Sequence, residues 1–149
     1  MQPPKRPPRP TRRHFWHEEH TTAPSNRIWE IWTDVANWHH WDRGLRSARL
    51  SGTFTAGARG ELTALNGQTT PFELCTVVPG RTYTFRTKLP FGGLYVLRKL
   101  YPTETGTTFT HEVWFAGRSS GIFALLLGKK FQRLLPEAMR AITKIAEGS

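Results

Sequence analysis

The sequence predicts a mixed α+β domain in which a seven-stranded antiparallel sheet is covered on one face by a long C-terminal helix. Two observations predict this fold class. Between residues 45 and 116, turn residues separate runs of about 8–12 residues rich in Thr, Val, Phe and Tyr, as in an antiparallel meander. After residue 119, apolar residues recur at spacings of three and four, as on one face of a helix. The length of 149 residues suits a single domain.

The elements before the meander are a strand and two short helices. Residues 14–22 form the expected first strand, which the turn residues Ala23-Pro24-Ser25-Asn26 end. A helix follows, with Ser25 as its expected N-cap and with Ile28, Trp29 and Trp32 at helical spacing. Asp34 and Asn37 break this helix before a second short turn that carries Trp38 and Trp41.

Six further strands and one helix complete the chain. The expected strands are residues 45–54, 58–65, 70–78, 82–89, 93–101 and 107–116. The long helix covers residues 119–147, and Pro136 inside it predicts a kink or restart between Gln132 and Leu135. Lysine and arginine side chains on its other face are expected to meet solvent.

The formal net charge of +10 is distributed unevenly along the chain. Residues 1–13 hold five basic residues, five prolines and no acid, so this segment is expected to be an extended, disordered tail before a domain at 14–149. A solubilising tail is favoured over an arm that seeks phosphate, because charge runs are usually solvated. The start of the chain lacks the apolar core of a secretory signal, and no apolar run is long enough for a transmembrane segment.

Several motifs together resemble the START-like, polyketide cyclase/dehydrase (SRPBCC) superfamily. The resemblance covers residues 14–147 and implies a helix-grip fold, in which a strongly curved sheet wraps around the long helix and leaves a cavity between them. It is specific for the fold and poorly specific for function, because members include cyclases and ligand carriers. The motifs are IWTDVANWHHWD at 31–42, GTF at 52–54 with 57–62, VPGR at 78–81, GTTFTH at 106–111 with Gly117, and LLPEA at 134–138.

Alternation along two neighbouring strands predicts which side chains line this cavity. A hairpin that turns about Glu104 and Thr105 places Arg98 opposite His111 within an otherwise apolar wall. The neighbouring guanidinium favours a neutral imidazole near pH 7. A structural histidine and a snorkelling arginine remain alternatives. The full expected ligand-binding set is Val96, Arg98, Leu100, Phe109, His111, Val113, Phe115, Phe131, Leu135 and Trp41.

Other patterns that resemble catalytic, metal or cofactor sites lack the partner residues or the spacing that such sites need. Ser119 stands in a nucleophile-elbow pattern, but no histidine follows it, and an N-cap role for Ser119 or Ser120 explains it. His17 and His20 point to opposite faces of a strand, and the cluster at 39–42 lacks helical metal-site spacing, so no metal is expected. No phosphate-binding loop is present, so no cofactor is expected.

Three functions remain open at this point. The first is binding of a small hydrophobic or aromatic molecule, lipid-like or polyketide-like, in the cavity. The second is a cyclase or dehydratase in the same cavity, with His111 as proton carrier and Arg98 polarising a carbonyl. The third is a module that binds an anionic surface, nucleic acid or membrane, through residues 1–13 together with the basic face of the last helix, although no motif points to a nucleic-acid partner. The single thiol, Cys75, favours a cytoplasmic location, and the sequence does not indicate an oligomeric state.

Overall fold

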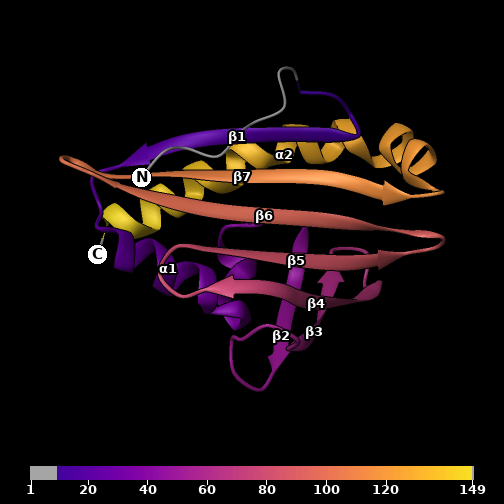
Figure 1. The fold of residues 1–149 in the computed structure, drawn as a ribbon, viewed down its shortest axis with the longest axis horizontal. Coiled ribbons are helices and arrows are strands. Elements are labelled where there is room, and N and C mark those ends of the chain that lie inside the picture. The colour runs from indigo at the N-terminus through magenta and orange to yellow at the C-terminus, as the bar shows by residue number, and fades with distance from the viewer. Residues whose placement is uncertain (1–9, 149) are drawn as a thin grey trace.

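The computed structural model describes residues 10–148, which form one seven-stranded antiparallel sheet and a long helix (Figure 1). The strand order is β1-β7-β6-β5-β4-β3-β2, so β2 to β7 form a meander and β1 joins its end. The predicted fold class is therefore confirmed. The strands are β1 (His14–Thr21), β2 (Leu45–Ser51), β3 (Arg59–Ala64), β4 (Thr69–Val78), β5 (Thr82–Leu89), β6 (Gly92–Thr103) and β7 (Gly106–Gly117). The helices are α1 (Ser25–Thr33), the 3₁₀ helix η1 (Val35–His40) and α2 (Ser120–Glu147).

Turn chemistry sets the register of the hairpins. Asn66-Gly67 closes the hairpin between β3 and β4, and Gly67 has a φ of 89°, a conformation that glycine adopts without steric cost. In the hairpin of β6 and β7, Thr103 pairs with Gly106, so the turn lies at Glu104 and Thr105 as predicted. This register places Arg98 opposite His111, which is also as predicted.

The start of α1 differs from the prediction in one detail. Ser25 is the first helical residue and not the N-cap, which is Pro24 in an extended conformation. The hydroxyl of Ser25 instead lies 3.1 Å from the hydroxyl of Thr107 on β7. A contact with a distant strand has therefore replaced the local capping bond that the sequence suggested.

The segment of the two short helices brings Trp32 of α1, Trp38 of η1 and Trp41, directly after η1, into the core. Trp32 is fully buried, and Trp38 and Trp41 are nearly so. The indole nitrogen of Trp38 donates to the carbonyl of Trp32 at 2.8 Å, which fixes η1 against α1. The ring of Trp38 also packs against Phe72 on β4 and Phe85 on β5. These tryptophans thus join the short helices to the far half of the sheet.

Helix α2 runs as one helix from Ser120 to Glu147, and Pro136 lies inside it without breaking it. The expected N-cap position of Ser119 is confirmed, but its hydroxyl makes no capping bond. The C-terminal half of α2 is anchored by Ala138, Met139 and Ile142, which are buried. Figure 1 shows α2 lying behind β1 and β7, along the long axis of the molecule.

The expected tail at residues 1–13 lies mostly outside the described residues. Of its described part, the backbone of Arg12 passes close to Gly128 on α2, and the carbonyl of Arg13 accepts a hydrogen bond of 2.9 Å from the backbone of Phe115. Residues 12 and 13 therefore extend the edge of the sheet along α2. None of the helices in residues 10–148 has the length and hydropathy of a membrane span.

Candidate functional site

The residues that the sequence placed on a cavity wall share the inner faces of β6 and β7. Val96, Arg98 and Leu100 on β6 are buried, and so are Phe109, His111, Val113 and Phe115 on β7. The ring of Phe115 stacks on that of Phe131 of α2, with centroids 6.4 Å apart. Leu135, one turn further along α2, is half-buried against the same core. The alternation inferred from the sequence is therefore the one that the sheet adopts.

Arg98 holds its charge inside an aromatic cage. Its side chain is buried, with the residue 5% exposed, and one guanidinium nitrogen donates to the hydroxyl of Tyr83 on β5. The central guanidinium carbon lies 5.1 Å from the ring centre of Trp38, 4.9 Å from that of Trp41 and 5.0 Å from that of Phe85. Such positions over aromatic faces stabilise a cation, more so when water is excluded.

The Asp42 carboxyl lies near Arg98. Its pKa is raised above the usual value, mainly by burial, and the charge of Arg98 and a hydrogen bond from the backbone of Gly44 offset only part of that rise. The Gly44 N–H donates to a carboxylate oxygen of Asp42 at 3.0 Å. In the sequence, Asp42 stood out only as the last residue of the family motif at 31–42 and as part of a rejected metal cluster, so its place beside Arg98 was not predicted.

His111 is fully buried and lacks hydrogen-bond partners. Neither of its ring nitrogens has a partner among the described residues. Burial lowers the pKa of His111 well below its usual value, and the charges of Arg98 and of His17 lower it further. The imidazole is therefore neutral at pH 7, as the sequence predicts, and offers one donor and one acceptor. The rings of Trp32 and Trp41 flank it at 5.6 and 6.2 Å.

Three more buried nitrogens around His111 have no partner within residues 10–148. They are Nε of Arg98 and the indole nitrogens of Trp32 and Trp41. Buried polar atoms in folded proteins nearly always have partners, because leaving one without a partner costs about 1–3 kcal/mol. Each of these three atoms is a donor only. The interior here therefore holds three donors without a partner, beside an imidazole that can donate one hydrogen bond and accept one, and this arrangement suits a bound oxygen atom.

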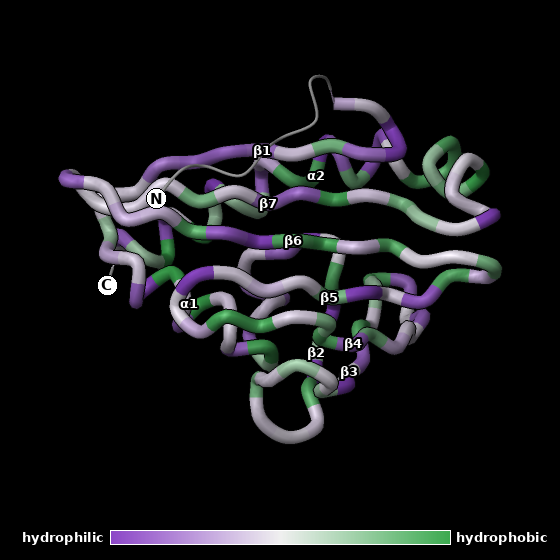
Figure 2. Tube along the Cα trace, in the orientation of Figure 1, coloured by the Kyte–Doolittle hydropathy of each residue, from purple (hydrophilic) through white to green (hydrophobic). Residues whose placement is uncertain are grey.

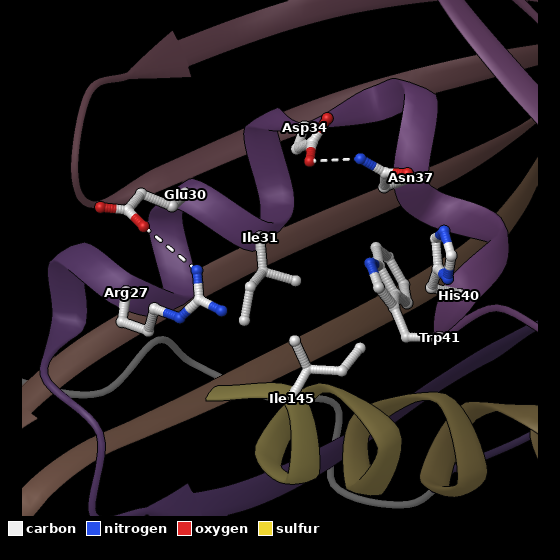
Figure 3. Close-up of a pocket in the computed structure, with 8 residues that line it drawn as sticks. All are labelled: Arg27, Glu30, Ile31, Asp34, Asn37, His40, Trp41 and Ile145. Carbon is white, nitrogen blue, oxygen red and sulfur yellow. Dashed lines mark hydrogen bonds and ion pairs between the residues drawn. The ribbon is translucent and has the colours of Figure 1, made fainter. Parts of the chain in front are cut away.

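A pocket of about 530 Å³ opens next to this cluster, between the two short helices and the end of α2 (Figure 3). Ile31, Trp41 and Ile145 supply its apolar surface. Polar side chains surround it, including an ion pair of 3.2 Å between Arg27 and Glu30. The remaining lining residues are Asp34, Asn37 and His40, of which Asn37 donates to Asp34 at 2.7 Å.

Trp41 connects the pocket to the buried cluster, since it lines the one and its ring contacts Arg98 of the other. The rest of the predicted ligand-binding set lies deeper, in the core on β6 and β7, or further along α2. Two of the pocket-lining residues, Ile31 and Arg27 of α1, were not predicted from the sequence. Ile31 follows the helical spacing of the buried residues in α1, but nothing in the pattern marks Arg27.

The histidine-containing clusters have other contacts. His17 lies 2.8 Å from Glu19, and His20 contacts the hydroxyls of Thr108 and Thr105. The rings of His39 and His40 lie 4.3 Å apart. In the described part of the chain, no group of three or more His, Cys, Asp or Glu side chains has the geometry to hold a metal ion.

Comparison with known proteins identifies one matching family and many solved structures with a similar fold. Residues 12–147 match the family model described as polyketide cyclase / dehydrase and lipid transport. A search of the curated proteins finds no match.

Solved structures share the fold at low sequence identity. Protein MLL2253 from Mesorhizobium loti superimposes with a TM-score of 0.75 and 19% identity, over 92% of this chain and 98% of that one. The structure of Ara h 8.0201 superimposes with a TM-score of 0.72 and 13% identity, over 91% of this chain and 98% of that one. The di-domain ARO/CYC StfQ from the steffimycin biosynthetic pathway matches with a TM-score of 0.71 and 15% identity, over 91% of this chain and 50% of that one.

Proposed function

The chain belongs to the polyketide cyclase / dehydrase and lipid transport family, and from this premise we propose that it binds a small hydrophobic molecule that carries an oxygen acceptor. The apolar body of the ligand occupies the pocket between α1, η1 and α2. Its oxygen accepts hydrogen bonds from the donor cluster of Arg98, Trp41, Trp32 and His111. The family resemblance seen in the sequence is confirmed by the family match, whereas the ligand and its contacts are our proposal.

The observation that carries this proposal is the set of three buried donors that lack a partner in the described residues, beside the pocket. The pocket volume of about 530 Å³ lies within the range of roughly 300–1,000 Å³ usual for small-molecule sites. Burial of the apolar part of a ligand contributes about 25 cal/mol per Å². Acceptance of a hydrogen bond from a charged donor contributes more than a neutral hydrogen bond, so the Arg98 cluster sets the orientation of the ligand.

A matched pair of probes tests the proposal. Naphthoic acid and methylnaphthalene have the same apolar body, but only the first carries acceptor oxygens. We expect the folded protein to bind naphthoate about tenfold or more tightly than methylnaphthalene, in calorimetry and in ligand-induced increases of the melting temperature. Equal affinity for the two probes, or binding of neither, contradicts the proposal.

Three variants locate the binding. Arg98→Met removes the charge at similar length and is expected to abolish the preference for naphthoate. Trp41→Phe keeps a ring in the pocket wall, removes one donor and is expected to weaken naphthoate binding less. Arg140→Met on the exposed side of α2 is the control and leaves both affinities unchanged. Circular dichroism of each variant separates a loss of binding from a loss of folding.

A second candidate function is cyclase-type chemistry in the same site. It is favoured by the neutral, unpartnered imidazole of His111 next to a buried guanidinium, since this pair can move a proton and polarise a carbonyl. Turnover of a linear polyketone that is lost in His111→Ala, while naphthoate still binds, identifies an enzyme. Binding without turnover identifies a carrier. The single thiol Cys75 is compatible with the cytoplasmic location that we propose.

A further inference from the structure

One end of the molecule exposes large apolar side chains that the proposed ligand site does not use. Phe91, in the turn between β5 and β6, is 83% exposed. Ile122, Leu125 and Leu126, in the first turns of α2, are 62–68% exposed. We call these four residues the apolar tip. Large exposed apolar side chains mark an interaction surface when they are contiguous.

The four side chains belong to one surface. The backbone N–H of Ser119, which precedes α2, donates to the carbonyl of Phe91 at 3.4 Å, so the turn lies against the start of the helix. Ile122, Leu125 and Leu126 are three and four residues apart and therefore share one helix face. Figure 2 shows hydrophobic colour at both the start of α2 and the adjoining end of the β5–β6 hairpin.

The start of α2 is apolar on both sides. Phe123, Ala124 and Leu127 pack toward the core, while Ile122, Leu125 and Leu126 face outward. A helix segment that is apolar all round is normally covered on every side. Phe91 also has a φ of 59°, which a bulky side chain rarely adopts, although the next residue in the chain is a glycine. The chain thus keeps a phenyl ring exposed at some conformational cost.

Basic residues lie beside the apolar tip, along the outer face of α2 and at Gly121. Along the outer face of α2, Lys129, Lys130 and Arg133 follow the exposed leucines, and all three are exposed. Arg13 also reaches this end, because its guanidinium lies next to Gly121. Residues 86–103 and 113–136 contain no Asp or Glu. We call Arg13, Lys129, Lys130 and Arg133 the basic belt.

We propose that the apolar tip and the basic belt dock the protein on an anionic phospholipid surface. Apolar side chains next to lysine and arginine are the combination that binds at the interface of an anionic bilayer, with each basic residue adding attraction. A second copy of the chain fits less well, since docking tip to tip brings two basic belts together. A nucleic acid would match the charge but not the leucines and phenylalanine.

This docking leaves the ligand pocket accessible. Ile145 of the pocket lies 23 residues after Ile122 along α2, which corresponds to roughly 35 Å of helix. Figure 1 places the start of α2 and the α1 region at opposite ends of the long axis. The proposal therefore stands independently of the proposed function, and the two can fail separately.

Vesicle cosedimentation with the full chain tests the proposal. We expect binding to vesicles of phosphatidylcholine mixed with phosphatidylglycerol, weak binding to phosphatidylcholine alone, and weaker binding as salt is raised. The double variant Leu125→Ser/Leu126→Ser is expected to lower the partition coefficient about tenfold or more, since two apolar side chains leave the interface. Lys129→Glu/Lys130→Glu is expected to lower it to a similar extent.

Matched controls use residues of the same kind elsewhere. Leu65→Ser removes an equally exposed leucine in the turn after β3, and Lys144→Glu reverses a charge at the other end of α2. Both are expected to bind vesicles as the wild type does. Equal binding to neutral vesicles, or binding lost on deletion of residues 1–9 but not in the tip variants, overturns the proposal. The proposal is also overturned if the wild type fails to bind vesicles and instead forms a dimer in analytical ultracentrifugation that the Leu125→Ser/Leu126→Ser variant does not form.

Discussion

At the scale of single residues, the interior of this domain contains an arginine and a histidine where apolar side chains would be expected. Arg98 is stabilised by the hydroxyl of Tyr83, by aromatic rings and by the nearby Asp42. His111 has no such support, because both of its nitrogens lack partners among the described residues. Burial without partners therefore disfavours the protonated form of His111, and its pKa is lowered.

The burial of His111 predicts a pH-dependent stability. Because its folded-state pKa lies well below the unfolded value of about 6.5, the unfolded chain binds more protons below that pH. We expect the free energy of unfolding to fall as the pH falls below about 6.5, by up to about 1.4 kcal/mol per pH unit from this group. Urea unfolding at a series of pH values measures the slope.

The variant His111→Phe is expected to lose this part of the slope. His20→Gln, at an exposed position of β1, is the control and should keep the wild-type slope. The interpretation is wrong if His111→Phe and the wild type lose stability in parallel between pH 6.5 and the acid transition.

At the scale of elements, α2 has two halves with different surroundings. Met139 and Ile142 in its second half are fully buried, whereas Leu125 and Leu126 in its first half are exposed. Close contact in the first half depends on Gly128, since a Cβ atom there would lie 2.8 Å from Cβ of Arg12 and still closer to its carbonyl oxygen. The absence of a side chain thus allows the segment before β1 to cross the helix.

This contact predicts opposite effects of alanine at two glycines of one helix. Gly128→Ala should destabilise the fold by about 1–3 kcal/mol, because the clash with backbone exceeds the gain of about 1 kcal/mol in helix propensity. At Gly121 the neighbour is the flexible end of Arg13, so Gly121→Ala should be neutral or stabilising by up to about 1 kcal/mol. Denaturant unfolding measures both changes.

Limited trypsin digestion gives an independent readout of the same contact. Cleavage after Arg12 and Arg13 should be faster in Gly128→Ala than in Gly121→Ala, since only the first variant displaces that segment. Equal cleavage rates, with equal stabilities, would show that Arg12 does not pack on α2.

At the scale of the whole molecule, a single core joins the sheet, the short helices and α2. The aromatic cluster of Trp38, Phe72 and Phe85 links η1 to the far strands, and Met139 fills the space beneath α2. Each described helix and strand buries apolar side chains against other elements of this core. Cooperative unfolding is therefore expected for this domain.

The core predicts how a cavity in α2 affects the rest of the fold. Met139→Ala should lower the free energy of unfolding by about 2–5 kcal/mol, since Met139 is fully buried. Far-UV circular dichroism and tryptophan fluorescence should shift together, because all the elements share one core. The exposed Leu65→Ala is the control, with an expected change within about 0.5 kcal/mol. Separate transitions for the two probes would show that α2 unfolds independently.

The sequence by itself determined the order of the elements, the meander and the pairing of Arg98 with His111. These follow from local signals, because turn residues and the alternation of side chains along a strand act over a few neighbouring positions. Local signals failed at Ser25, where a contact with Thr107 on a distant strand replaced the expected cap. They also failed to indicate the partnership of Arg98 with Tyr83 and Asp42.

Only the tertiary structure decided where the pocket opens and which surface remains uncovered. The pocket lies between Ile31 of α1 and Ile145 of α2, residues more than a hundred positions apart, rather than along the wall of β6 and β7. The exposure of Leu125 and Leu126 likewise depends on how far α2 extends beyond the sheet and its neighbours. Both features arise from the packing of distant segments, which no periodicity within one segment encodes.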